Sequence, residues 1–279
     1  MFWKVTHRTL DLSKRALLMG VLNVTPDSFS DGGRWGNAEG AIAAGLAMAA
    51  EGADLLDVGG ESSRPGAAPV SPAEELRRVL PVIEALAAQS SALISVDTSK
   101  PEVAREALRH GASVVNDITG LRQAPMRRVL LESGAGAIAM HMQGSPATMQ
   151  AAPVYADVVS EVSAFLKESL RLCVEEGIAP EQLLFDPGIG FGKTVQHNLL
   201  LLRHLESIQA AGRPVALGVS RKSFLGALTG SPALEDRAWP TVALTSFARS
   251  RGAVLIRVHE VKANAEALRM TEAILEASE

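Results

Sequence analysis

The chain has only one cysteine, Cys173, and this scarcity excludes an internal disulfide and fits a reducing compartment. It also lacks long hydrophobic runs, since each apolar stretch falls far short of the roughly 20 residues that span a bilayer. Residues 1–15 carry charges every few positions and have no apolar centre, unlike a signal peptide. We therefore expect a cytoplasmic protein that does not contact a membrane.

Blocks of like charge are absent as well. The 27 Lys and Arg residues and the 31 Asp and Glu residues are dispersed, and they give a net charge of −4. Without a basic patch, the sequence shows no electrostatic footprint for nucleic acid. Core-forming residues are plentiful, because 47% of the 279 residues are hydrophobic. Since α/β barrels of this length commonly form one unit, we expect a single domain over residues 1–279.

Short apolar runs alternate with longer helical patterns from end to end of the chain. Such runs are typical of parallel strands that are buried on both faces. Strict alternation implies right-handed crossovers, and eight strand–helix units favour a closed (β/α)8 barrel over a doubly wound open sheet. The expected strands are Ala16–Asn23, Asp54–Gly59, Leu93–Asp97, Ser113–Asp117, Ala137–His141, Leu183–Asp186, Val215–Val219 and Val254–Val258.

Helical patterns fill the intervals, and their ends carry cap signals. Ser71 and Ser99 each stand three residues before a Glu, which is the pattern of a capping box. Gly follows several of the helices as the expected C-terminal stop. The first ten residues alternate between polar and apolar side chains, which predicts a small hairpin at the bottom of the barrel. The expected helices include Asn37–Glu51, Pro72–Gln89, Tyr155–Glu176, Thr194–Ala211, Arg237–Arg251 and Glu260–Glu276.

Polar residues terminate every expected strand. A single residue of this kind is more often a helix cap than a functional group. In a barrel, however, all these strand ends meet at one face, where active sites are built. Carboxylates, amides, histidines and cations that converge on one mouth therefore predict a functional site. Its members are Asn23, the loop 60–66, Asp97, Asn116, Asp117, Met140, His141, Asp186, the segment 220–223, Arg257 and His259.

The predicted mouth has two chemical characters. Asp97, Asn116 and Asp186 offer mainly acceptors, which suit the N–H edge of a heterocycle such as an aminopyrimidinone. Arg64, Lys222, Arg257 and His259 offer donors for anionic oxygens such as those of phosphate. The amide oxygen of Asn23 can join the coordination of Mg²⁺ when substrate phosphates and waters supply the other ligands.

Two other motifs suggest different kinds of site. The segment 187–194 nearly matches a phosphate-binding P-loop, but Pro187 stands where the first Gly is required, and a glycine turn beside a flat ligand is favoured instead. Lys222 after the seventh strand also allows a Schiff-base lysine in an aldolase-like barrel, with the flanking cations Arg221 and Arg257 lowering its pKa.

Taken together, eight segments resemble the bacterial dihydropteroate synthase family. They are MGVLNVTPDSFSDGG (19–33), DVGGESSRPGA (57–67), SVDTSKPEVAREAL (95–108), VNDITG (115–120), HMQGSPATMQ (141–150), DPGIGFGKT (186–194), GVSRKSFLG (218–226) and RVHEV (257–261). They follow in order over nearly the whole chain. The resemblance implies a TIM barrel, agreeing with the strand count. It also implies that p-aminobenzoate displaces the diphosphate of 6-hydroxymethyl-7,8-dihydropterin diphosphate with Mg²⁺, in folate synthesis.

The resemblance assigns roles to residues at matching positions. Those implied to contact the pterin are Asp97, Asn116, Asp186 and Lys222, with Ile118, Met140, Phe191 and Gly218 shaping the slot. Asn23, Arg257 and His259 resemble the diphosphate and Mg²⁺ site. Loops 24–36 and 60–71 would close over the aryl substrate, bringing Phe29, Ser63, Arg64 and Pro65 to it. Ser223, at a helix N-terminus, would hold the benzoate carboxylate. Asp97, Lys222, Arg257, Phe29, Asp27 and Arg64 would take part in catalysis.

The resemblance further implies a homodimer. Two positions depart from the family's sequence pattern, and two alternative functions remain. Ser63 stands where the family usually has Thr, and the segment 237–241 departs from the small-residue pattern expected there. A pterin-dependent methyltransferase domain with a corrinoid partner shares the acceptor floor. A non-catalytic pterin-binding protein would keep that floor and lose the diphosphate groups.

Overall fold

The fold is a barrel of eight parallel strands, seen in a computed structural model that describes residues 1–25, 36–64, 66–231 and 233–277. The strands lie in the order β8-β7-β6-β5-β4-β3-β10-β9, and a bridge between Phe185 and Val215 joins the two ends of that order. The closed barrel is thereby confirmed and the open sheet is wrong. The strands are β3 (Leu17–Asn23), β4 (Leu55–Gly59), β5 (Leu93–Asp97), β6 (Val114–Asp117), β7 (Gly136–Met140), β8 (Leu183–Asp186), β9 (Ala216–Gly218) and β10 (Leu255–Val258).

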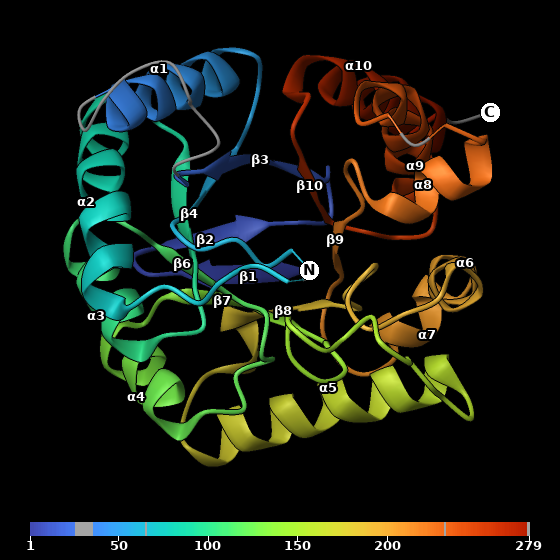
Figure 1. The fold of residues 1–279 in the computed structure, drawn as a ribbon, viewed down its shortest axis with the longest axis horizontal. Helices are drawn as coiled ribbons and strands as arrows, with labels where there is room; N and C mark the ends of the chain where they lie inside the picture. The colour runs from blue at the N-terminus through green and yellow to red at the C-terminus, as the bar shows by residue number, and fades with distance from the viewer. Residues whose placement is uncertain (26–35, 65, 232, 278–279) are drawn as a thin grey trace.

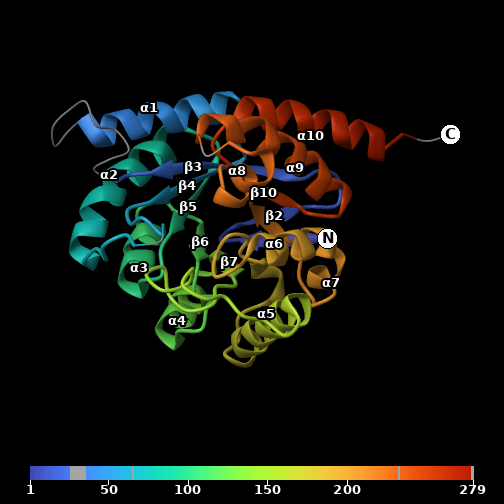
Figure 2. The same ribbon diagram turned by 45° about the vertical axis from the view of Figure 1, so that its right-hand side comes forward.

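Helices surround the strands as an outer ring (Figures 1 and 2). Each helix or helix pair follows one strand, as the alternation predicts. They are α1 (Gly36–Ala50), α2 (Pro72–Gln89), α3 (Pro101–Arg109), α4 (Ala124–Ser133), α5 (Val158–Glu175), α6 (Val195–Arg203), α7 (Leu205–Gln209), α8 (Ser223–Thr229), α9 (Ala238–Ser250) and α10 (Val261–Leu275), with short 3-10 turns at Pro180–Gln182 and Glu235–Arg237.

The helix ends show where local sequence signals hold and where they fail. Ser71 caps α2, because its hydroxyl accepts the amide N–H of Glu74 at 3.3 Å. Ser99 is not a cap: α3 begins at Pro101 with Lys100 before it, so that prediction is wrong by one residue. The predicted helix 194–211 is interrupted at His204, which separates α6 from α7. The predicted start of α5 is also wrong, since Asp157 accepts the first amides of this helix.

Two apolar layers hold the barrel together. The outer layer lies between the sheet and the helices and includes the buried Cys173 of α5. The inner layer fills the lower half of the barrel with side chains of alternate strand positions, among them Met19, Leu55, Ile138 and Leu184. Alternation follows from the two-residue period of a strand, which sends successive side chains to opposite faces.

A small antiparallel hairpin closes the lower end, as predicted. It consists of β1 (Phe2–Val5) and β2 (Arg8–Asp11), and its Trp3 and Val5 side chains are fully buried in the inner layer. The Trp3 indole N–H donates to the carbonyl of Gln182 at 2.9 Å, so the polar atom of this large side chain is satisfied. The active face of such a barrel therefore lies at the other, carboxyl end of the strands.

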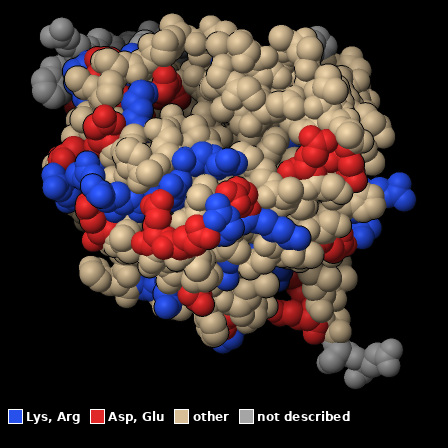
Figure 3. All heavy atoms as spheres, turned by 90° about the horizontal axis from the view of Figure 1, so that it is seen from below, with Lys and Arg blue, Asp and Glu red and all other residues tan. Residues whose placement is uncertain are grey.

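The surface carries both signs of charge in alternation. On the face seen from below Figure 1, Lys and Arg side chains intermingle with Asp and Glu in a band across the middle, while much of the upper part is uncharged (Figure 3). Exposed ion pairs such as that of Arg171 with Glu168 and Glu175 on α5 exemplify this pattern. Among the described residues, none of the helices combines the length and hydropathy required to cross a membrane.

Candidate active site

Polar side chains form the upper half of the barrel interior. Asn23, Gly59, Asp97 and Asn116 are successive Cα partners across β3, β4, β5 and β6, so they lie in one row at the carboxyl ends of these strands. Two residues lower on the same face, Asp57 and Ser95 are partners in the row beneath. On β4 and β6 the barrel interior thus changes from apolar to polar within one side-chain repeat, from Leu55 to Asp57 and from Val114 to Asn116.

Arg257 connects two carboxylates from different strands. Its Nε donates to Asp57 Oδ2 at 2.6 Å, and its Nη2 donates to Asp97 Oδ2 at 2.9 Å. Asp57 also accepts Asn116 Nδ2 at 3.0 Å, which fixes the amide of the neighbouring strand. The predicted acceptor floor and the predicted cationic rim are therefore joined through one guanidinium.

Asp57 is a residue of this network that the sequence reasoning missed. It is fully buried in the middle of β4, and among the described residues its Oδ1 has no hydrogen-bond partner. Its sequence signal is an Asp inside an otherwise apolar strand, at the alternate position that faces the barrel interior. A buried charge at such a position requires a partner, and that requirement could have identified it.

Burial raises the pKa of Asp97 to about 7, and the nearby charge of Asp57 acts in the same direction. Arg257 opposes both effects. The Arg257 guanidinium faces Oδ2 of Asp97.

Asp186 lies at the end of β8 with its carboxylate at the mouth. Its Oδ1 accepts the amide N–H of Gly188 at 2.7 Å, and its Oδ2 points toward Gly218 of β9. A Cβ on Gly218 would lie 3.7 Å from Oδ2, so this position sits directly against the carboxylate. Burial raises the pKa of Asp186, whereas the Gly188 amide and the charge of Lys222 lower it.

Lys222 reaches across the mouth from the residue that precedes α8. Its Nζ donates to the carbonyl of Ile189 at 2.5 Å and lies 4.0 Å from the ring centroid of Phe191. Gly190 permits this approach, because a Cβ there would lie only 2.8 Å from the lysine Cδ. Burial lowers the pKa of Lys222 to about 7, and Arg257 adds to the effect, while Arg221 instead pairs with Glu260.

His259 follows β10 and lies within the cationic part of the mouth. Burial lowers its pKa to about 3, and the charges of Arg257, Arg221, Arg64 and Lys222 lower it further. Its ring Nδ1 lies 2.8 Å from the hydroxyl of Ser220. A neutral imidazole that is surrounded by several cations can accommodate a bound anion.

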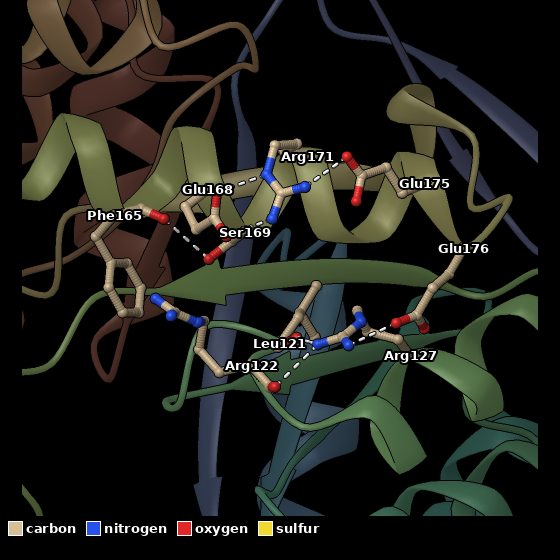
Figure 4. A network of polar contacts seen from close by, with 9 residues as sticks. All are labelled: Leu121, Arg122, Arg127, Phe165, Glu168, Ser169, Arg171, Glu175 and Glu176. Atoms are coloured by element: carbon tan, nitrogen blue, oxygen red, sulfur yellow. Dashed lines mark hydrogen bonds and ion pairs between the residues drawn. The ribbon is translucent and has the colours of Figure 1, made fainter.

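Ile118 and Met140 are predicted slot residues, and the loop that carries Ile118 is held from outside the barrel. Asp117 accepts the amides of Thr119 and Leu121. Figure 4 shows Arg127 of α4 donating to the carbonyl of Leu121, at 2.9 Å, and pairing with Glu176 at the end of α5. These contacts fix the loop after β6 and so fix where Ile118 lies.

Two polar strand-end residues do not join the mouth. Asp117 occupies the outward position of β6, where its carboxylate binds its own loop. His141 lies behind the barrel wall, with Nδ1 2.9 Å from the buried Lys193 and its ring against Phe165 of α5. The prediction that placed both at the mouth is wrong because alternate residues of a strand face opposite sides.

The remaining predicted residues are partly or fully exposed or lie outside the described part of the chain. Ser63 is half-buried, while Arg64 and Ser223 are exposed. Arg64 is near enough for its charge to affect His259. Asp27, Phe29 and Pro65 lie outside the described residues.

The donor set bears on the kind of metal that this mouth can hold. Within the described ranges there is no cluster of three or more His, Cys, Asp or Glu side chains suited to a metal ion. Asn23 is half-buried at the end of β3 and supplies a neutral amide oxygen. Such a set fits a Mg²⁺ whose other ligands are substrate phosphates and waters, rather than an ion caged by protein alone.

Comparisons with known proteins agree with this geometry. A family model described as pterin binding enzyme matches residues 19–259. The dihydropteroate synthase of Escherichia coli K12 is 48% identical over 271 residues, covering 97% of this chain and 95% of that protein. The solved structure of Xanthomonas albilineans dihydropteroate synthase with 4-aminobenzoic acid has a TM-score of 0.93, with 46% identity and full coverage of both chains. The same enzyme in complex with 7,8-dihydropteroate has a TM-score of 0.89 at 44% identity, covering 99% of this chain and 100% of that one.

Proposed function

From the premise that the chain belongs to the pterin binding enzymes, as a member of the dihydropteroate synthase family, we propose the reaction that it performs. The amino group of p-aminobenzoate attacks the methylene of 6-hydroxymethyl-7,8-dihydropterin diphosphate. The C–O bond to diphosphate breaks ahead of C–N bond formation, and one proton leaves the nitrogen. The products are 7,8-dihydropteroate and diphosphate.

One observation carries this proposal: acceptors for a heterocycle and donors for an anion occupy the same mouth. Asp97 and Asp186 place carboxylate oxygens there, while Lys222 and Arg257 bring positive charge within the same polar layer. A pterin offers an amino and ring N–H edge to carboxylates, and its diphosphate requires cations. No observation favours the methyltransferase alternative.

The chemistry requires positioning and charge more than a nucleophile–base pair. Loss of diphosphate leaves positive charge on a methylene conjugated with the pterin, and the carboxylates of Asp97 and Asp186 stabilise that charge. The arylamine is already neutral at pH 7, so it needs no strong base. The slot formed by Ile118, Met140 and Phe191 orients the flat ring for in-line attack.

Mg²⁺ belongs to the proposal as a partner of the diphosphate. When bound, it neutralises charge on the leaving group and so makes the diphosphate a better one. Asn23 would supply one oxygen, and Arg257 and His259 would contact the phosphate oxygens directly. Ser223 at the start of α8, with Ser63, Arg64 and the undescribed Pro65 and Phe29, would hold p-aminobenzoate.

A homodimer in the cytoplasm is part of the same proposal. Helices α9 and α10 expose large apolar side chains, including Trp239 at 78% and Met270 at 65% of their accessible surface. Exposed apolar residues of this size on two adjacent helices favour a partner surface. A second copy of the chain is expected to cover them, and Trp239→Glu should shift sedimentation toward the monomer.

The reaction itself is tested with purified protein. Diphosphate release should require the pterin diphosphate, p-aminobenzoate and Mg²⁺ together, and chromatography should identify 7,8-dihydropteroate as the product. Omission of any one component should abolish release. Absence of the product under complete conditions would refute the function.

A further inference from the structure

Ser220 and His259 are neighbours at the mouth although 39 positions separate them in the sequence. Ser220 follows β9 and His259 follows β10, and these two strands are parallel partners. The Ser220 side chain is buried, with 8% of its surface exposed. Its hydroxyl makes two contacts with the same residue: the backbone N–H of His259 at 3.2 Å and the ring Nδ1 of His259 at 2.8 Å.

The two contacts together determine where the protons lie. The backbone N–H can only donate, so Ser220 Oγ accepts there. The hydroxyl proton then needs an acceptor, and within the described part of the chain Nδ1 is the acceptor that the structure gives it. If Nδ1 carried a proton instead, the oxygen would accept twice and its own proton would lack a partner in a buried place.

We propose that Ser220 is a positioning residue that holds His259 in the Nε2–H tautomer, so that the ring presents a donor to the leaving diphosphate. This inference deepens the proposed function, and it rests on that function for the identity of the anion. The state of one ring nitrogen is set by the hydrogen bond that the other makes. Ser220 therefore acts through His259 and does not touch the reacting atoms.

The charges around His259 explain why a fixed tautomer is useful at this position. Burial and the cations Arg257, Arg221 and Arg64 disfavour a second proton on the ring, and the pKa of His259 is about 3. A neutral histidine donates from only one nitrogen. With the other tautomer, a lone pair would face the phosphate oxygens, and a charge-assisted hydrogen bond would become a repulsion.

The tautomer is measured directly by long-range ¹H–¹⁵N NMR of ¹⁵N-histidine-labelled protein near pH 7.5, without ligands. Two other histidines serve as internal references. The backbone N–H of Thr194 donates to Nδ1 of His197 at 3.3 Å, so that ring should show the same tautomer. Nδ1 of His110 donates to the carbonyl of Glu106 at 2.7 Å, so that nitrogen should be protonated. An unprotonated Nδ1 for His259 is expected, whereas a protonated Nδ1 would overturn the proposal.

Two variants distinguish the effect of the Ser220 hydroxyl on His259 from an effect on folding. Ser220→Ala should give His259 an averaged tautomer signal and weaken Mg²⁺–diphosphate binding about twofold in calorimetry, since about half of the rings would then carry the Nε2–H tautomer that donates to the phosphate. Ser220→Thr retains a hydroxyl and should keep the parental tautomer and affinity. Ser169→Ala removes a buried hydroxyl that donates to Phe165 on α5 and should change neither.

Each outcome decides the proposal. An unaltered His259 spectrum in Ser220→Ala, or an altered spectrum with unaltered diphosphate affinity, would refute it. If Ser220→Ala does not fold, the parental spectrum and Ser220→Thr still provide the test. The tautomer is read without substrates, so failure of the dihydropteroate assay with a confirmed tautomer would refute the proposed function alone.

Discussion

The lower and upper halves of the barrel interior use the same strands for opposite purposes. The lower half is filled by Met19, Leu55 and Leu184, with Trp3 from the hairpin beneath them. The upper half places Asp57, Asp97 and Arg257 on the same strands or their neighbours, only one or two side-chain layers away. The lower half stabilises the fold by removing apolar surface from water. The upper half buries charges of opposite sign that must be paired with one another.

This contrast shows how the barrel tolerates a polar interior. A buried charge without a partner lowers the stability of the fold by several kcal/mol, so the charges of the upper half are tolerated because they are paired. Arg257 is bonded to both Asp57 and Asp97, and Asp57 also accepts the Asn116 amide. Stability below and substrate recognition above are therefore expected to respond differently to substitution.

The largest effect is expected from Arg257→Met. This change leaves two carboxylates without their shared partner and should lower the free energy of unfolding by about 3–5 kcal/mol, with loss of activity. Denaturant titration and the product assay measure both effects. A second change, Asp57→Asn, should restore part of the stability. Arg171→Met removes only exposed ion pairs on α5 (Figure 4) and should differ little from the parent, and a similar loss there would contradict the assignment.

Trp3→Ala should separate stability from catalysis. The fully buried indole fills the bottom of the barrel, so its loss should cost about 3–5 kcal/mol of unfolding free energy. Because the hairpin lies at the end away from the mouth, KM and kcat at 25 °C should stay near the parental values. Phe2→Ala alters an exposed side chain of the same strand and serves as the control. A large change in KM with Trp3→Ala would show that the two halves are coupled.

Asp186→Asn tests the acceptor floor. Replacement of a charge-assisted contact, worth roughly 1.5–3 kcal/mol, should weaken pterin binding by one to two orders of magnitude. Calorimetry with the pterin substrate gives the affinity, and unchanged binding would remove Asp186 from the site. Asp157→Asn, at the exposed N-cap of α5, keeps a capping side chain and should bind the pterin normally.

The pH dependence of stability should expose Asp97. Its pKa is about 7 in the folded protein and near 3.8 when unfolded, so the folded state holds a proton that the unfolded state has lost between these values. The contribution of Asp97 to stability is therefore present below about pH 4 and declines as the pH rises toward 7. His141 and His259, with pKa values of about 3, have the opposite slope below 6.5.

Because these slopes overlap, the informative quantity is a difference between two proteins. The unfolding free energy of the parent minus that of Asp97→Asn should fall between about pH 4 and pH 7 and level off above. Denaturant titrations across this range measure it. A flat difference would mean that Asp97 stays ionised in the folded protein.

The smallest effect is expected from Ser63→Thr, which adds the methyl group that the resemblance implies is usual. One buried methyl group is worth about 0.8 kcal/mol at most, so the KM for p-aminobenzoate should fall by no more than about fourfold. Ser62→Thr, one position earlier in the loop, is the matched control. A rise in KM would indicate that the smaller side chain fits its surroundings better.

Sequence patterns located the strands and helices of this molecule well, but they did not always show which side chains meet. The short apolar strands and the C-terminal ends of the Gly-terminated helices agree with the structure within a residue or two, because hydrophobic period and cap chemistry are local. His204, which divides α6 from α7, carries no breaker signal, so the division was missed. The assignment of Asp117 and His141 to the mouth failed because polarity at a strand end does not reveal which face a side chain occupies.

The sequence by itself determined eight strands, most of their helices, the amphipathic hairpin and the set of polar residues that end the strands. Only the tertiary structure decided which of those residues meet. Asp57 and Arg257 are 200 positions apart, and the pairing of Cα partners around a closed ring brings them into contact. The physical reason is that periodicity fixes alternation along one strand, whereas barrel closure fixes which alternate face is inside and which distant charges must satisfy one another.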